Sequence, residues 1–393
     1  GIDGSHSWGN RQWTLSGFLA GSRVKGSAEA IASTQTAAAH YFTRPDADYL
    51  SYDPDRTSLQ GHTLGASISH SGSWDVSATY KDVSPGFETN DIGFMNRGDY
   101  RAFSTFLGRR VNQPQGAFRN RSTYVYHNAA WNYGSDLIYN SFGAGANGQL
   151  KNFWFVGMFG TWNLPRFDDR AAFGGPAIRR PTSWNVGMDV STDDRKPLSL
   201  GWGLNYGDGG GGFRRYAYAS VNYRPTSSIR LSVTPELTRE RDAVQFITSE
   251  EDAAATATYG TRYVFASDDR TEVAMSTRLD WTFTPTLSLQ LYAQPYISAN
   301  DFVDYRSLAR PRSYEFDPYT RADNDDFTYM SLRGNAVLRW EYRPGSALFF
   351  VWQQNRAGDT DTGKFSFGDN TSGVFDRASR NVLLIKATYW LNR

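Results

Sequence analysis

Apolar and polar residues alternate at every second position along several long segments of the chain. Between residues 286 and 298, for example, Leu287, Leu289 and Leu291 occupy one parity, and Ser288 and Gln290 occupy the other. The side chains of a β-strand point alternately to the two faces of a sheet, so this period predicts strands with one apolar and one polar face. The pattern therefore favours an all-β chain whose sheet separates two different environments.

The length of the alternating segments distinguishes between two all-β architectures. Strands of soluble sandwiches and propellers usually have about 5–6 residues. Many segments here alternate over about 10–13 residues, the length of a tilted membrane-spanning strand. No repeat of about 40 residues with a fixed signature supports a propeller. We therefore expect a membrane barrel and keep a soluble all-β fold as the alternative.

Composition excludes several other classes of protein. The 393 residues include 12 Trp, 23 Tyr and 25 Phe, too many aromatic residues for a disordered chain. No stretch approaches about 18 consecutive apolar residues, which excludes a transmembrane helix. The net charge of +1 gives no electrostatic reason to expect nucleic-acid binding. Because the chain has no cysteine, it has neither disulfides nor thiolate metal sites.

Three prolines mark tight turns between alternating segments: Pro225, Pro285 and Pro344. Transmembrane barrels place short turns in the periplasm and long loops outside. We accordingly assign three polar segments to external loops, residues 163–182, 299–326 and 357–378. The predicted fold is a single domain, residues 1–393, that forms a closed antiparallel transmembrane β-barrel of about 18–20 strands.

Parity refines this prediction. An even number of strands must separate two periplasmic turns. Between Pro225 and Pro285, strands near 227–238 and 271–283 account for two, so the residues between them hold either two more strands or none, with 241–248 and 259–266 as the candidates. A further strand is expected over residues 34–43, which makes the total 19. Because a barrel normally has an even number, one more strand lies upstream or within residues 1–10, or one of the counted strands is not a separate strand. Because the chain starts at Gly1 without a signal peptide, we expect a mature or partial chain, whose first residues are a truncated strand or a linker from an upstream domain. Residues 23–34 are the first candidate for a segment that plugs the lumen.

Four segments carry a family resemblance: 278–295 (RLDWTFTPTLSLQLYAQP), 86–94, 263–265 (YVF) and 384–390 (LIKATYW). They resemble a group of uncharacterised outer-membrane proteins in which a domain similar to family-nine carbohydrate-binding modules precedes a C-terminal barrel. The resemblance covers most of the chain, and only the barrel part. It implies a barrel in the outer membrane of a Gram-negative-type bacterium, with the carbohydrate-binding-like domain outside these residues.

Charged residues occupy the polar parity of neighbouring predicted strands. In a barrel their side chains face the lumen, where mixed charges can line a porin-like pore or select a solute. Adjacent Arg and carboxylate side chains can equally pair across strands and fill the lumen. These lumen-lining candidates are Arg230, Glu236, Glu272, Arg278, Asp280, Arg339 and Glu341.

One external segment offers a candidate calcium site. Asp359 and Asp361 are two residues apart before a glycine, and Asp369 could add a third ligand. Calcium loops use such spacing because alternate side chains converge on one ion. The other interpretation is an acidic, solvated external loop, because the further ligands of a full calcium loop are not in register. We expect no other cofactor.

These observations favour a non-enzymatic outer-membrane barrel that acts as a pore or as the membrane anchor of an envelope assembly. The alternative is a surface receptor that binds a partner or a glycan through its external loops. A barrel hydrolase is the third hypothesis, although no serine signature supports it. Expected partners are outer-membrane lipid, lipopolysaccharide and other envelope proteins. Cations in external loops, at Arg179, Arg180, Arg310 and Arg312, suit lipopolysaccharide phosphates.

Overall fold

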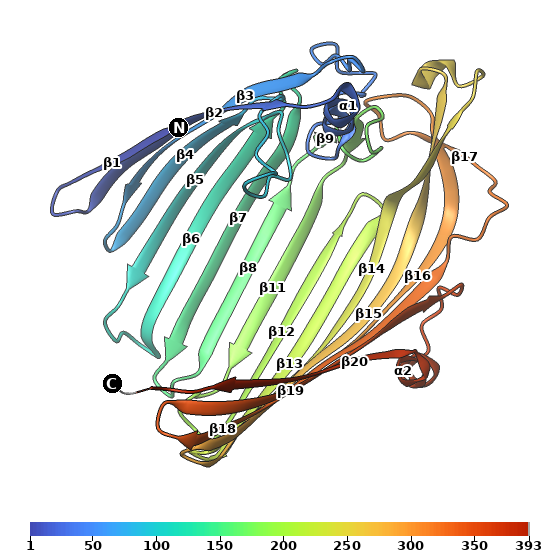
Figure 1. Cartoon of the computed structure of the whole chain (residues 1–393). Coiled ribbons are helices and arrows are strands. Elements are labelled where there is room, and N and C mark those ends of the chain that lie inside the picture. The colour runs from blue at the N-terminus through green and yellow to red at the C-terminus, as the bar shows by residue number, and fades with distance from the viewer. Residues whose placement is uncertain (392–393) are drawn as a thin grey trace.

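The computed structural model describes residues 1–391 and shows a strongly curved, all-β chain (Figure 1). The first half of the sheet contains the strands β1 (Ile2–Trp8), β2 (Trp13–Lys25), β3 (Ser58–His70), β4 (Trp74–Val83), β5 (Tyr100–Val111), β6 (Phe118–Trp131), β7 (Leu137–Leu150) and β8 (Phe155–Asn163). A short helix, α1 (Ala28–Thr36), lies between β2 and β3. Two three-residue strands, β9 (Arg166–Asp168) and β10 (Ile178–Arg180), pair with each other apart from the main sheet.

The second half continues the same sheet with generally longer strands. They are β11 (Ser183–Ser191), β12 (Leu198–Gly209), β13 (Gly212–Thr226), β14 (Ile229–Glu251), β15 (Thr261–Thr284), β16 (Leu287–Leu308), β18 (Phe327–Arg343), β19 (Ser346–Thr360) and β20 (Ser379–Thr388). The short strand β17 (Phe316–Pro318) pairs with the end of β16. A 3-10 turn (Thr256–Thr258) precedes β15, and a second helix, α2 (Phe367–Asp376), precedes β20.

The sheet is an antiparallel meander in which consecutive long strands are neighbours. Within residues 1–391 it has seventeen strands when the short β17 is set aside. β1 pairs only with β2, and β20 pairs only with β19, so the described sheet is open. An odd number of alternating strands makes the two edge strands, β1 and β20, run in the same direction. The predicted closure of the barrel is therefore absent from the described residues.

Three differences between the predicted and the observed strands explain why the sheet has seventeen strands and not 18–20. Residues 241–248 and 261–266 are not separate strands but parts of β14 and β15, which have 23 and 24 residues, and residues 259–260 lie in the turn before β15. Bulges between Asp242 and Thr248 break the alternation there, which made one strand resemble two. Residues 34–43 do not form a strand, because they contain the end of α1 and an irregular connection. The strand allowed within residues 1–10 is present as β1.

The long connections lie at one edge of the sheet and most of the short turns at the other, with the two-residue turn between β12 and β13 on the long-loop side. The predicted Pro turns correspond to residues 227–228, 285–286 and 344–345, and all three lie at one edge, which we call the short-turn edge. The long connections lie at the opposite, long-loop edge, among them residues 26–57, 164–182, 309–326 and 361–378. Figure 1 shows α1 of the first connection at the top and α2 of the last at the lower right. The three predicted Pro turns thus share one edge and the three predicted loops the other, although residues 299–308 and 357–360 belong to β16 and β19 and not to loops. The assignment of the two edges to periplasm and exterior stays a prediction.

The polar face of the sheet is its concave face. The β9/β10 hairpin lies inside the curve of the sheet (Figure 1), and Arg180 of β10 is 3.8 Å from the carboxylate of Asp242 on β14. Asp242 shares its face of the sheet with Glu240, Glu236 and Arg230 by alternation. The outer face carries the apolar positions, such as Leu231 and Leu237.

Glycines on the concave face leave room for aromatic rings to lie against the sheet. Gly143 is directly opposite Tyr126, and a Cβ atom added to Gly143 would lie 2.2 Å from the Tyr126 ring. The Tyr126 hydroxyl crosses this glycine to reach the Thr161 hydroxyl at 2.8 Å. Gly203 accommodates Tyr218 on β13 in the same way. The tyrosines therefore cover part of the concave face instead of projecting from it.

The two helices lie at the long-loop edge. The Ser27 hydroxyl caps α1 by accepting a hydrogen bond from the Ala30 amide at 3.3 Å. Helix α2 packs through the buried Val374 against Ile297 and Met330, which share the outer, apolar face of β16 and β18 with Leu289. Among the helices of the described chain, none has the length and apolarity needed to cross a membrane.

Candidate functional site

Connections at the long-loop edge fold over the concave face of the sheet and contact one another there. We call this region the mouth and define it by residues 26–57, 84–99, 132–136, 164–182 and 309–326. Figure 1 shows α1 and the β9/β10 hairpin inside the rim of the sheet. The predicted plug segment, residues 23–34, contains the end of β2 and most of α1, so part of it lies in the mouth.

A buried ionic network joins these connections. Arg44 donates hydrogen bonds to Asp46 and Asp169, both at 3.2 Å, and lies 3.9 Å from Asp99. Arg97 donates to the same Asp169 oxygen at 2.7 Å. The side chains of Arg44 and Asp169 are only 2% and 1% exposed. Buried charges persist only when they are paired and hydrogen-bonded, so the network holds these connections in one arrangement.

Further bonds extend the network across the mouth. Tyr49 donates to Asp99 at 2.7 Å, and the Asp46 carboxylate accepts the Ala177 amide at 2.8 Å. Arg312, from the β16–β18 connection, forms a bidentate pair with Asp136, from the β6–β7 connection. Planar, bidentate Arg–carboxylate pairs fix geometry as well as charge. The mouth is thus cross-linked from opposite sides of the sheet.

Burial and charge change the pKa values of the mouth groups in opposite directions. Burial raises the pKa of Asp99 against the opposing hydrogen bonds from the Tyr133 amide and the Tyr49 hydroxyl. Burial also works to raise the pKa of Asp169, but Arg97 and Arg44 outweigh it and leave that pKa lowered. Burial, with Arg97 nearby, lowers the pKa of Arg170 to about 10. The mouth therefore contains carboxyl groups that take up protons at different pH values.

A second polar cluster ties α1 to the rim. The buried His40 ring contacts Glu88 through Nε2 at 2.7 Å and the Pro85 carbonyl through Nδ1 at 2.8 Å. The buried Gln35 amide of α1 donates to the Asp53 carbonyl at 2.8 Å and accepts the Asp53 amide at 3.0 Å. These contacts hold the connection after β2 at both ends of its folded part.

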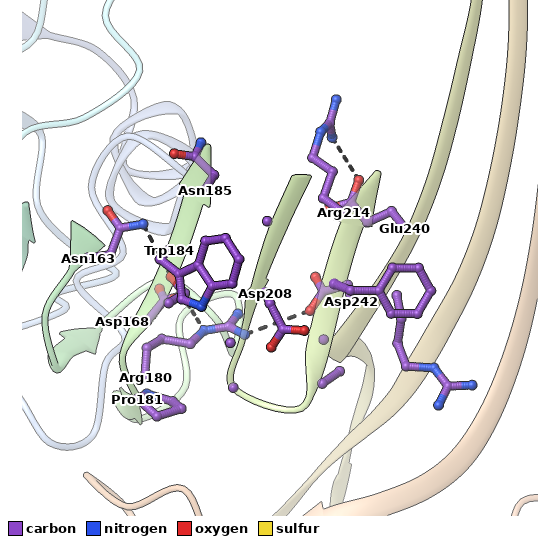
Figure 2. Close-up of a pocket in the computed structure, with 18 of the residues that line it drawn as sticks. Asn163, Asp168, Arg180, Pro181, Trp184, Asn185, Asp208, Arg214, Glu240 and Asp242 are labelled. Atoms are coloured by element: carbon purple, nitrogen blue, oxygen red, sulfur yellow. Dashed lines mark hydrogen bonds and ion pairs between the residues drawn. The ribbon is translucent and has the colours of Figure 1, made fainter. Parts of the chain in front are cut away.

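Below the mouth, a polar pocket of about 370 Å³ opens between the β9/β10 hairpin and the ends of β11–β14 (Figure 2). Arg180 bridges Asp168 at 3.1 Å and Asp242 at 3.8 Å, and Arg214 pairs with Glu240 at 2.7 Å. Asn163, Asn185 and Tyr314 add neutral polar groups. The lining thus offers both hydrogen-bond donors and acceptors, with little net preference for one charge.

One cation of this pocket is incompletely satisfied. The Nη1 atom of Arg166 is buried and has no hydrogen-bond partner among the described residues. Burial lowers the pKa of Arg166, against the opposing charge of Asp168. Buried donors without partners are rare and costly. This unpaired donor makes Arg166 a candidate for contact with a bound ligand.

The seven predicted lumen-lining residues lie on the concave face, in two groups near the short-turn edge and mid-strand. Arg278 pairs with Asp280 at 3.2 Å, and Arg339 pairs with Glu341 at 2.6 Å. Glu236 accepts from Tyr216 at 3.1 Å, and Glu272 accepts from Tyr296 at 2.9 Å. Arg230 is directly opposite Asp280. Most of these charges have partners, and their part in solute selection stays a prediction.

The three calcium candidates are not gathered in the structure. Asp359 occupies a concave-face position of β19, whereas Asp369 lies in α2, outside the sheet, and accepts from the Ser366 hydroxyl at 2.7 Å. Asp361 contributes a backbone carbonyl to Asn324. Among residues 1–391, no group of three or more His, Cys, Asp or Glu side chains is placed to hold a metal ion. Calcium binding stays a prediction.

Sequence reasoning missed the mouth network. Its central partners, Arg44 and Asp169, are 125 residues apart, and Arg312 and Asp136 are 176 residues apart. The one usable signal is the density of charge in the connections, at Arg44-Pro45-Asp46 and Asp168-Asp169-Arg170. That signal indicates polar loops but not which loops meet.

Comparison with known proteins gives a family and distant structural likenesses. No curated protein matches the chain. The siderophore receptor PirA from Acinetobacter baumannii is 9% identical, with a TM-score of 0.40 over 98% of this chain and 69% of that one. A mutant of the ferric enterobactin receptor PfeA from Pseudomonas aeruginosa is 8% identical, with a TM-score of 0.40 over 97% of this chain and 68% of that one.

The family comparison covers nearly the whole chain. The upstream carbohydrate-binding-like domain implied by the sequence resemblance is not part of this match and stays a prediction. Residues 23–392 match the model of a family described as "Domain of unknown function (DUF5916)", and the chain belongs to that family.

Proposed function

We propose that the chain forms the wall of a barrel in the bacterial outer membrane and acts there as a non-enzymatic receptor whose mouth is closed by its own connections. The observation that carries the receptor role is the buried network between Arg44 and Asp169. An open pore needs a clear passage through the mouth, whereas a receptor needs connections held in a fixed arrangement. The pore hypothesis is therefore the less favoured one.

The outer face supports the membrane location. Large apolar side chains stand exposed there, for example Leu383 at 80%, Ile385 at 70% and Met158 at 65%. Extended exposed apolar surfaces are unfavourable in water and mark membrane or protein contacts. Long strands with one apolar face are the form in which a sheet crosses a bilayer.

Single-cysteine variants test whether the sheet is a membrane wall, because the chain has no native cysteine that would also be labelled. Leu231→Cys places a thiol on the outer face and Ser232→Cys places one on the concave face, one residue apart on β14. In isolated outer membranes, a charged maleimide should label Ser232→Cys readily and Leu231→Cys poorly. Equal labelling of both variants would contradict a membrane wall.

Conductance tests the closed mouth. The purified chain in planar bilayers should conduct far less than an unobstructed barrel of similar strand number. Replacing Arg44 by alanine should raise the conductance, because it leaves the charge of Asp169 buried without its partner. Large, steady conductance by the unchanged protein would support the pore hypothesis and reject a closed mouth.

The pocket of Figure 2 suggests the ligand class. Mixed Arg, Asp and Asn side chains suit a polyhydroxylated molecule, which both donates and accepts hydrogen bonds, so we propose a glycan. A glycan array probed with the labelled chain should give hits that Arg166→Gln removes. Arg310→Gln, an exposed change outside the pocket, is the matched control. An array without hits would reject a glycan ligand.

A further inference from the structure

The outer face of the sheet carries an apolar groove of about 980 Å³ that extends from β7 to β14. Small side chains form its floor, and longer ones stand around it. Met158, Leu204 and Leu237 are 65%, 55% and 48% exposed. Six neighbouring strands contribute, so the groove is about 24 Å wide at the usual strand spacing. This width exceeds what a single hydrocarbon chain needs.

Two arginines lie together at the long-loop end of this groove. Arg215 on β13 and Arg239 on β14 are directly opposite in the register and line the groove. Both are exposed, and neither has a carboxylate within ion-pair distance among the described residues. Like charges directly opposite in a sheet destabilise it. The sheet therefore carries a local electrostatic cost at this position.

The neighbouring arginines, in contrast, all have a carboxylate partner. Arg214 pairs with Glu240 at 2.7 Å, Arg270 pairs with the same carboxylate at 2.8 Å, and Arg241 pairs with Asp269. Arg215 instead rests against the rings of Phe213 and Tyr206, at 4.9 and 5.6 Å. Within the described part of the chain, Arg215 and Arg239 therefore have no carboxylate partner, although the arginines at neighbouring positions do.

Their level on the sheet matches a lipid headgroup. Tyr206 is directly opposite Arg215, and Trp184 is directly opposite Trp162 on the same side of the sheet. Rows of Trp and Tyr mark the border between hydrocarbon and headgroups. Below this row the outer positions of β13 are apolar, from Ala217 to Val221. The arginines therefore stand where a lipid phosphate would lie.

We infer that this groove binds the lipid A part of lipopolysaccharide, with acyl chains over the apolar floor and a phosphate between Arg215 and Arg239. The inference rests on the proposed outer-membrane location, in which the long-loop edge faces the leaflet that holds this lipid. Guanidinium groups bind phosphate through paired, charge-assisted hydrogen bonds. A phosphate between them also relieves the repulsion of the two cations. The width of the groove fits a lipid with several acyl chains.

The test measures binding of purified lipopolysaccharide to the full chain in a neutral detergent. The double variant Arg215→Gln/Arg239→Gln should bind at least about tenfold more weakly, since it loses both charged contacts to the phosphate. Lipopolysaccharide should raise the Tm of the unchanged chain but not that of the double variant. Without lipid, the double variant should melt no lower, because its like-charge contact is gone.

Two further variants separate charge from shape. Arg109→Gln removes an outer-face arginine that stacks on Trp74 at 5.3 Å near the short-turn edge, and it should leave binding unchanged. Ala217→Phe fills the floor of the groove without changing charge, and it should weaken binding.

Three outcomes would overturn the inference: equal binding by the double variant, equal binding of dephosphorylated lipid A, or equal stabilisation by phosphatidylglycerol. Failure of the cysteine-labelling test would instead reject the membrane location itself, so the two failures can be told apart.

Discussion

Arg44 and Asp169 meet in the mouth at 3.2 Å, although they come from connections 125 residues apart in the chain. Each is almost completely buried, and each has further partners in the same network. Removal of either member leaves the other as a buried charge with fewer partners, which is more costly than removal of both. The pair therefore couples the connection after β2 to the connection after β8.

Arg44→Ala should destabilise the mouth locally, by about 3–5 kcal/mol, as expected for breaking a buried ion pair from one side. Hydrogen exchange should accelerate in residues 26–57 and 164–182, while the strands of the sheet keep their protection. Arg310→Ala, which removes an ion pair with both members exposed, should leave stability nearly unchanged, because water screens such pairs. Unchanged exchange in both connections would show that the network does not hold the mouth.

Acid should loosen the mouth in a defined pH window. The pKa of Asp169 is lowered from its ordinary 3.8, and that of Glu88 from 4.5. Stability from such groups is present above the ordinary values and is lost as pH falls through the lower, folded values. Asp99, whose pKa burial raises, is protonated first, and this relieves a cost instead of opening the mouth.

Conductance measured at decreasing pH checks this order. It should stay low above the ordinary carboxyl pKa values, 3.8 for Asp169 and 4.5 for Glu88, and rise only as pH falls below them. Asp169→Asn should conduct more at every pH, whereas Asp99→Asn should behave like the unchanged chain near neutral pH. A rise near neutral pH would assign the transition to other groups.

Gly143→Ala should destabilise the sheet, because its Cβ would lie 2.2 Å from the Tyr126 ring. Displacing that ring breaks the hydrogen bond to Thr161, and overpacking of this kind typically costs about 1–3 kcal/mol. Thermal unfolding in detergent measures the change. Gly334→Ala is the control, since its nearest neighbours lie at 3.8 and 3.9 Å, and it should be neutral or slightly stabilising. A Tm for Gly143→Ala equal to that of the control would contradict the packing described.

Val374→Asp should release α2 from the sheet. Val374 is 1% exposed between Ile297 and Met330, and an unpaired carboxylate there would be buried at high cost. Limited proteolysis should then cut within residues 361–378 much faster than in the unchanged chain. Phe367→Asp, at a position 66% exposed on the same helix, should leave the cleavage rate nearly unchanged. Equal cleavage of both variants would mean that Val374 does not dock the helix.

The sequence was sufficient to predict the strands whose alternation is uninterrupted. The run from Leu287 to Leu291 and the turns near Pro225, Pro285 and Pro344 lie where period and turn chemistry place them. Prediction failed where bulges interrupt alternation, as in β14 between Asp242 and Thr248. It also failed at α1, where Ser27 and the alanines that follow are good capping and helix-forming residues.

The candidate site was less predictable than the sheet for a physical reason. Alternation is a local property that can be read along one strand, whereas the mouth depends on which distant connections meet. Arg312 and Asp136, which belong to different connections, carry no local sign of their pairing. The opposition of Arg215 and Arg239 likewise depends on the register of β13 and β14.

The parallel course of β1 and β20 has a mechanical consequence for the wall. If these two edges seal against each other, the seam is a parallel pair, whose slanted hydrogen bonds are slightly weaker per residue than those of the antiparallel ladders elsewhere in the described sheet. An odd number of inserted strands would make the seam antiparallel instead. A parallel seam would therefore be the pairing of the sheet that separates most easily, whereas an antiparallel seam would resemble the other ladders.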